Sequence, residues 1–95
     1  MSARVYVLLD VMEGRKQQVA HCLLGRRGIL MADTTEGKPD IIFVAEGASR
    51  QKLAELTMRA IAAIESMIED FNLLPVQSIS NNTILFKRHH IHVTK

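Results

Sequence analysis

The sequence predicts an α+β fold in which two helices cover one face of an antiparallel sheet. Runs of apolar, β-favouring residues occupy 4–11, 29–33 and 41–45 almost without polar interruption. Two further segments, 15–24 and 50–71, carry apolar residues at helical spacing. Gly, Pro, Asn and Asp gather between several of these segments, where the chain has to turn.

The stretch 33–45 is the centre of the predicted sheet. Gly37 can take the positive φ that a tight connection needs, and Pro39 holds φ at about −65°. Asp40 can accept hydrogen bonds from neighbouring backbone N–H groups. We therefore expect the strand at 29–33 to return through this turn as an antiparallel hairpin.

The two helical segments differ in length. The first, 15–24, has an apolar stripe of Val19, Cys22 and Leu23. The second begins after Ser49, a favourable N-cap residue, and is predicted to run to Phe71. Its expected apolar stripe consists of Leu53, Leu56, Ala60, Ile64, Met67, Ile68 and Phe71.

The order of elements predicts the topology. A strand at 73–79 and a further strand or tail at 84–93 follow the second helix. The resulting β-α-β-β-α-β order, with an extra C-terminal strand, predicts a ferredoxin-like sandwich. We expect one domain, with 1–80 as its body and 81–95 as a C-terminal strand or tail of the same domain.

Composition excludes several classes of function. With 95 residues, 47% hydrophobic and 23% charged, the chain is sized for one globular domain. A net charge of +2 and 4% aromatic residues argue against direct nucleic-acid binding. Asp10 closes the N-terminal apolar run, so no membrane span is expected. Cys22 is the only cysteine, which excludes an intrachain disulfide and fits a cytoplasmic protein.

The predicted strands are apolar on both faces. If the helices cover one face, residues of the opposite parity in 5–9, 29–32 and 41–45 form an exposed apolar patch. A second copy packed sheet to sheet would cover it, so we expect a homodimer or higher homo-oligomer. The alternative is that the C-terminal segment folds back over the face. Its basic residues suit that role poorly: Lys87, Arg88, His89, His90 and His92.

The central turn also carries the candidate ligand site. Glu36, Lys38 and Asp40 could present charges to a zwitterionic ligand at a subunit boundary. The alternative is that Asp40 only caps the turn while the other two are solvated. Arg26 and Arg27 could bind an anion, because guanidinium donors match carboxylate and phosphate groups, or could simply form a charged loop.

No catalytic or cofactor motif is recognisable. His89, His90 and His92 could begin a Zn²⁺ or Ni²⁺ site, with His21 as one source of a third ligand. Solvated histidines in a polar tail are the simpler interpretation, so we predict no metal site, no cofactor and no catalytic residue. Cys22 lies on the apolar stripe of its helix and is expected to fill core space.

The pattern resembles the effector-binding (RAM) domain of the Lrp/AsnC transcription regulators. The similar features are Gly14 before the first helix, Gly28-Ile-Leu at the second strand, Gly37-x-x-Asp40 before the third, and Ser49 before the second helix. The resemblance implies pairing through the sheets and binding of an amino acid or related small molecule between subunits.

On that resemblance, the expected ligand-binding residues are Glu36, Gly37, Lys38 and Asp40. Pro39 stands where the family usually has an aromatic residue. These 95 residues contain no helix-turn-helix segment before the first strand, so DNA binding is not among the expectations that the resemblance implies.

Three functions remain open at this point. The first is a non-enzymatic regulatory or small-ligand-binding domain that acts as a homo-oligomer. The second is a peptide- or protein-binding adaptor, of the NapD chaperone type, that uses the apolar sheet face. The third is a small enzyme of the dimeric α+β barrel kind.

Overall fold

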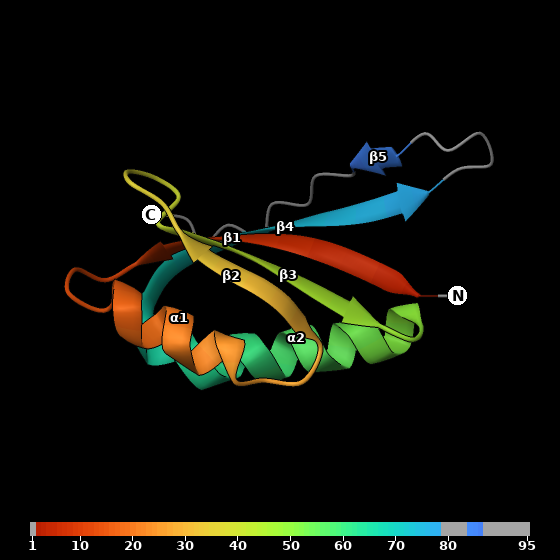
Figure 1. The fold of residues 1–95 in the computed structure, drawn as a ribbon, viewed down its shortest axis with the longest axis horizontal. Helices are drawn as coiled ribbons and strands as arrows, with labels where there is room; N and C mark the ends of the chain where they lie inside the picture. The colour runs from red at the N-terminus through yellow and green to blue at the C-terminus, as the bar shows by residue number, and fades with distance from the viewer. Residues whose placement is uncertain (1, 79–83, 87–95) are drawn as a thin grey trace.

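The computed structural model describes residues 2–78 and 84–86. Five strands form one antiparallel sheet in the order β2-β3-β1-β4-β5, and two helices lie on one of its faces (Figure 1). The elements in chain order are β1 (Ala3–Val11), α1 (Lys16–Leu24), β2 (Ile29–Thr34), β3 (Ile41–Gly47), α2 (Arg50–Ile64), the 3₁₀ turn η1 (Glu65–Met67), β4 (Ile68–Ser78) and β5 (Ile84–Phe86). The ferredoxin-like α+β prediction and its extra C-terminal strand are confirmed.

β1 lies at the centre of the sheet and determines which side chains meet the helices. It pairs with β3 on one side and β4 on the other, so that Val7 lies between Phe43 and Leu73. Alternate residues point to opposite faces of a strand. In β1 the residues at 5, 7, 9 and 11 are all buried, whereas those at 4, 6, 8 and 10 are not.

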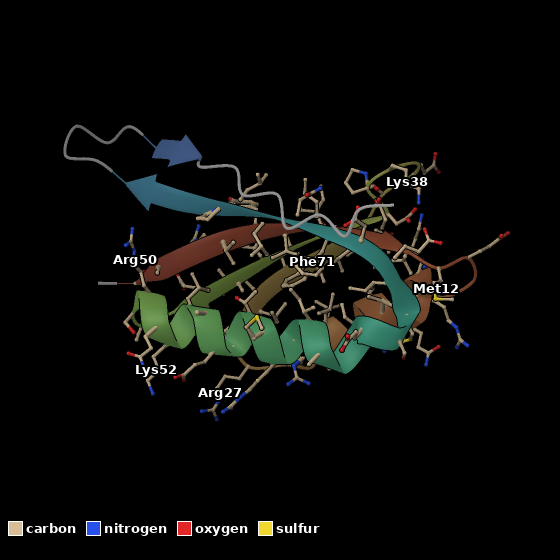
Figure 2. All side chains as sticks on the ribbon, turned by 180° about the vertical axis from the view of Figure 1, so that it is seen from behind. Met12, Arg27, Lys38, Arg50, Lys52 and Phe71 are labelled. Atoms are coloured by element: carbon tan, nitrogen blue, oxygen red, sulfur yellow. The ribbon has the colours of Figure 1, made fainter. Side chains whose placement is uncertain are left out.

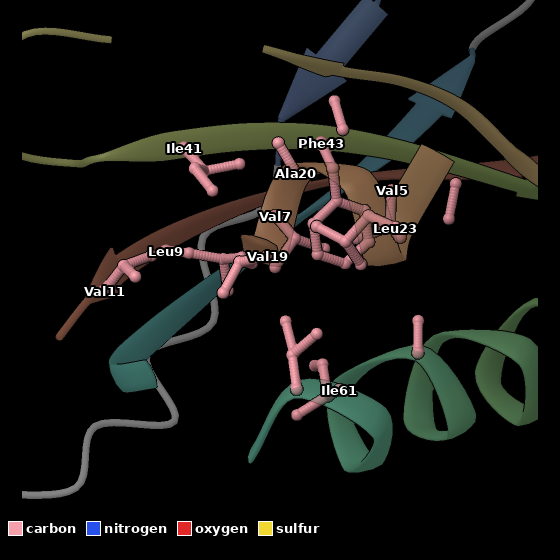
Figure 3. Packing of buried hydrophobic residues seen from close by; sticks show 14 of the residues in the cluster. Val5, Val7, Leu9, Val11, Val19, Ala20, Leu23, Ile41, Phe43 and Ile61 are labelled. Atoms are coloured by element: carbon pink, nitrogen blue, oxygen red, sulfur yellow. The ribbon is translucent and has the colours of Figure 1, made fainter. Parts of the chain in front are cut away.

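The core fills the space between the sheet and the two helices (Figure 3). Phe43, Leu9 and Leu23 are fully buried there, one each from β3, β1 and α1. Burying one such side chain stabilises the fold by about 1.5–3 kcal/mol. The helix contribution comes from Val19, Ala20, Leu23, Leu53, Ala60, Ile61 and Ile64.

Two local features bring α2 close to the sheet. Ser49 caps the helix as predicted, its side-chain oxygen accepting a 3.1 Å hydrogen bond from the backbone N–H of Lys52. Gly47, at the end of β3, leaves room for the first turn of α2. A Cβ at Gly47 would lie 2.6 Å from the backbone nitrogen of Leu53, so only glycine fits without a backbone shift.

The predicted end of the second helix is wrong. The helix ends at Ile64 instead of Phe71, and β4 begins at Ile68. Residues 68–71 fit a helical stripe, but here they pair with β1, with Leu9 opposite Phe71. Strand pairing on a buried face outweighs the local helical pattern. The predicted strand 84–93 is seen as β5 at its beginning, and its remainder lies outside the described residues.

The other face of the sheet is largely apolar, as predicted from strands that are apolar at both alternating sets of positions. Its apolar residues, which we call the open face, include Tyr6, Leu8, Met31, Ile42, Val44 and Leu74. They point away from the helices because their strand neighbours point into the core. Within the described residues, no helix is long and apolar enough to cross a membrane.

Candidate functional site

Asp40 joins the start of β3 to the end of β1. Its backbone N–H donates a 2.7 Å hydrogen bond to the carbonyl oxygen of Leu9, and its Oδ2 accepts a 2.8 Å bond from the N–H of Val11. Its own carbonyl oxygen accepts a 2.8 Å bond from the N–H of Thr35. These three bonds hold the carboxylate in one orientation at the edge of the core.

Two lysines approach the Asp40 carboxylate from different elements. Lys16, at the start of α1, places Nζ 3.7 Å from Oδ1 and donates a 2.6 Å hydrogen bond to the carbonyl of Thr35. Lys38, in the turn between β2 and β3, places Nζ 3.6 Å from Oδ2 of Asp40 and 3.6 Å from Oε1 of Glu69. The result is a small charge cluster drawn from three separate parts of the chain.

The cluster changes the acidity of its members. The hydrogen bond from the Val11 N–H is the largest influence on Asp40 and lowers its pKa; partial burial opposes this, and the charges of Lys38 and Lys16 add to it. For Lys38, loss of solvent is the largest single influence and lowers the pKa. The carboxylates of Asp10, Asp40 and Glu69 together outweigh it, so the pKa of Lys38 is raised. Both groups are therefore charged at neutral pH.

A polar hollow of about 420 Å³ opens beside this cluster. It lies where the β1–α1 loop, the β2–β3 turn and the start of β4 come together. We call it the polar hollow; its lining residues are Val11, Met12, Glu13, Gly14, Lys16, Lys38, Asp40 and Glu69. Two ammonium groups and three carboxylates thus surround one space, which suits a small ligand that carries both charges.

The structure divides the predicted ligand-binding residues into two pairs. Lys38 and Asp40 line the polar hollow. Glu36 and Gly37 are exposed in the turn and do not line it. Gly37 has the predicted positive φ, at 92°. Its role here is to let the chain reverse direction, and the turn places Lys38 over the hollow.

Three of the five charged residues that line the polar hollow are not among the predicted ligand-binding residues: Glu13, Lys16 and Glu69. Lys16 stands in the first predicted helix, 15–24, and Glu69 stands in the segment 50–71 that was predicted to be the second helix. Glu69 instead lies at the second position of β4, opposite the turn that carries Lys38. No signal in the linear sequence connects 16, 38 and 69, because only the sheet order brings them together.

Arg26 and Arg27 do not line the polar hollow. They line a separate hollow of about 370 Å³ together with Gly25, Leu56 and Arg59. In Figure 2, Arg27 points away from the sheet beyond the helix layer, whereas Lys38 lies on the opposite side of the sheet. The predicted pair of arginines is therefore joined by a third from α2.

The remaining candidates from the sequence are Cys22 and the histidines. Cys22 is half-buried and packs against the core, as predicted. His21 is exposed on α1, and among the described residues no group of three or more His, Cys, Asp or Glu side chains could hold a metal ion. His89, His90 and His92 lie outside the described residues.

An apolar groove of about 300 Å³ runs between α2 and β4. Leu53, Met58 and Ile61 form the helix side, and Phe71 and Leu73 form the strand side. Thr57 also borders the groove, but its hydroxyl is buried and has no hydrogen-bond partner within the described part of the chain.

Comparison with known proteins shows similarity in fold to a solved structure. No protein-family model matches the chain, and no curated protein matches it. A crystal structure of a hypothetical protein from Pyrococcus horikoshii is similar, with a TM-score of 0.69 and 19% sequence identity. The match covers 99% of this chain and 100% of that one. At this identity the likeness supports the ferredoxin-like architecture alone.

Proposed function

We propose that this protein is a regulatory, small-ligand-binding domain that acts as a homodimer or higher homo-oligomer. In this proposal the ligand is a small zwitterion, such as an amino acid, and it occupies the polar hollow. The observation that carries the proposal is the presence of ammonium and carboxylate groups around one space, on elements anchored by Asp40.

The ion pairs of Lys38 are long enough for a ligand to replace them. The contacts of Lys38 with Asp40 and Glu69 measure 3.6 Å each. Charge-assisted hydrogen bonds are typically about 2.7–2.9 Å long, so these are ion pairs without close hydrogen bonding. A ligand carboxylate can bind Lys38 while a ligand ammonium binds Glu69 or Glu13, and little existing interaction is lost.

The open face supports the oligomeric part of the proposal. Leu8 and Ile42, both half-buried, project from the central strands on the side away from the helices, and Val44 on the same face is buried. Apolar patches of this kind on a sheet mark interaction surfaces. Asp10, which lies on the same face, acts electrostatically on Lys38, so the rim of the polar hollow borders the proposed interface.

Ligand binding is tested by isothermal titration calorimetry with a panel of amino acids. We expect Lys38→Met and Glu69→Gln each to weaken binding by about tenfold or more, since each removes one charged partner. Glu55→Gln is the matched control, because Glu55 is an exposed carboxylate on α2 that does not line the hollow. Equal weakening by all three variants would refute the assignment of the site.

Pairing is tested by light scattering at several protein concentrations. We expect a dimer or larger species for the native chain and a shift towards monomer for Leu8→Asp. Leu24→Asp is the control, because Leu24 is exposed on α1, away from the sheet. A native monomer would overturn the pairing model and favour the alternative, a peptide-binding adaptor that uses the same open face.

A further inference from the structure

Three arginines meet around one hollow on the helix side of the molecule. Arg26 and Arg27 come from the turn between α1 and β2, and Arg59 comes from α2. Leu56 supplies an apolar surface, and no carboxylate is among the residues that line the hollow, which has a volume of about 370 Å³. We call it the arginine hollow.

The α1–β2 turn is held against α2 by close packing at Gly28. This residue has a φ of +88°, and a Cβ there would lie 2.7 Å from Cδ2 of Leu56. The carbonyl of Gly28 also accepts a 2.8 Å hydrogen bond from the N–H of Glu46 in β3. The turn is thus fixed on both sides, and Arg26 and Arg27 are held near Leu56. Arg59 follows Leu56 by three residues and therefore lies on the same face of the helix.

The guanidinium groups of the arginine hollow differ in their contacts from two other arginines of the chain. Among the described residues, none of the three makes a side-chain hydrogen bond or ion pair. Two other arginines do make such contacts: Arg4 lies 3.1 Å from the Glu46 carboxylate, and Arg15 donates a 3.0 Å hydrogen bond to Gln18. Three like charges around one small space repel each other, and a bound anion removes that repulsion.

We propose that the arginine hollow binds a small molecule that carries a phosphate group. Guanidinium groups present several N–H donors in a planar fork that matches phosphate oxygens, and three of them can surround one phosphoryl group. Leu56 is positioned to contact an apolar part of the same ligand. The proposal is independent of the zwitterion site, which is lined by different residues.

The test uses the full chain, with inorganic phosphate and phenyl phosphate as calorimetric probes at constant ionic strength. We expect both probes to bind, phenyl phosphate more tightly because its ring contacts Leu56. Arg59→Gln and the double variant Arg26→Gln/Arg27→Gln should each weaken binding by about tenfold or more. Arg59→Lys should recover only part of the affinity, since lysine keeps the charge but not the fork.

Arg50→Gln is the matched control. Arg50 is an exposed arginine at the start of the same helix, outside the hollow, so its loss makes the same change in net charge as Arg59→Gln. Unchanged phosphate binding in this variant is expected. Equal weakening by Arg50→Gln would show general surface electrostatics and overturn the proposal. The proposal would also be overturned if neither probe binds at millimolar concentration, or if only a long polyanion such as RNA binds.

Discussion

The backbone N–H of Val11 donates a 2.8 Å hydrogen bond to the carboxylate of Asp40, a residue 29 positions later in the chain. The bond forms where β1 ends, at a point where its register with β4 shifts between Asp10 and Val11. One side chain thereby secures the end of the central strand, the start of β3 and the lysines of the polar hollow. Structure and candidate site depend on the same carboxylate.

Removing the Asp40 side chain should destabilise the fold. Asp40→Ala leaves the partly buried N–H of Val11 without its acceptor, at a cost of about 1–3 kcal/mol in the free energy of unfolding. Asp40→Asn keeps an oxygen acceptor, so we expect a smaller loss. Urea denaturation measures both. Asp33→Ala, at an exposed aspartate of β2, is the control and should change stability by less than about 0.5 kcal/mol.

The lowered pKa of Asp40 makes stability depend on pH. The pKa of an aspartate in an unfolded chain is about 3.9, and the pKa of Asp40 in the folded protein is lower. Between the two pKa values the unfolded state binds more protons, so stability rises with pH there. This contribution is present above the unfolded pKa and is lost as pH falls through the folded pKa.

The measurement is the difference in unfolding free energy between the native chain and Asp40→Asn from pH 2 to pH 6. We expect the difference to shrink below about pH 4 and to vanish at the acidic end. A difference that stays constant across this range would mean that Asp40 is not stabilised as a carboxylate.

Replacing Thr57 by valine should stabilise the protein. The Thr57 hydroxyl is buried without a partner in the described chain, and valine has nearly the same shape without the polar group. We expect a gain of up to about 1 kcal/mol in thermal or urea unfolding. Thr35→Val is the contrasting variant. The hydroxyl of Thr35 donates to the carbonyl of Pro39, so its loss should destabilise the turn.

Gly47 should not tolerate even the smallest side chain. Gly47→Ala places a Cβ against the backbone of Leu53 at the start of α2, and a backbone cannot move aside as a flexible side chain can. We expect a loss of about 1–3 kcal/mol by urea denaturation. Gly25→Ala is the control, because its nearest atoms would lie at an ordinary 3.9 Å. Similar losses in both variants would contradict the packing argument.

The boundary near Ile68 shows where local pattern stops being informative. Ile64, Ile68 and Phe71 recur at helical spacing, so the linear pattern favours a continued helix. The same segment also supplies Phe71 and Leu73 at strand spacing. Pairing with β1 decides between helix and strand, because β1 offers this segment backbone hydrogen-bond partners that the segment's own sequence does not reveal.

The orientation of the side chains in β1 is a second feature that local pattern does not predict. Every residue from 5 to 9 is apolar or aromatic. Residue type therefore does not show which alternating set of positions faces the helices. The sequence therefore predicted two apolar faces without indicating which one meets the helices. The register with β3 settles the question, since Val7 opposite Phe43 lies beneath the helices.

The sequence by itself determined the order of elements, the turn at Gly37 and Asp40, and the cap at Ser49, because these depend on neighbouring residues. The tertiary structure alone decided the two hollows. Lys16 and Glu69 line the polar hollow together with Asp40 and Lys38. Arg59 lines the arginine hollow together with Arg26 and Arg27. These residues are far apart in the sequence, so local propensity does not predict that they meet. A turn or a cap is satisfied within a few residues, whereas a site forms where the sheet order and helix packing bring distant charges together.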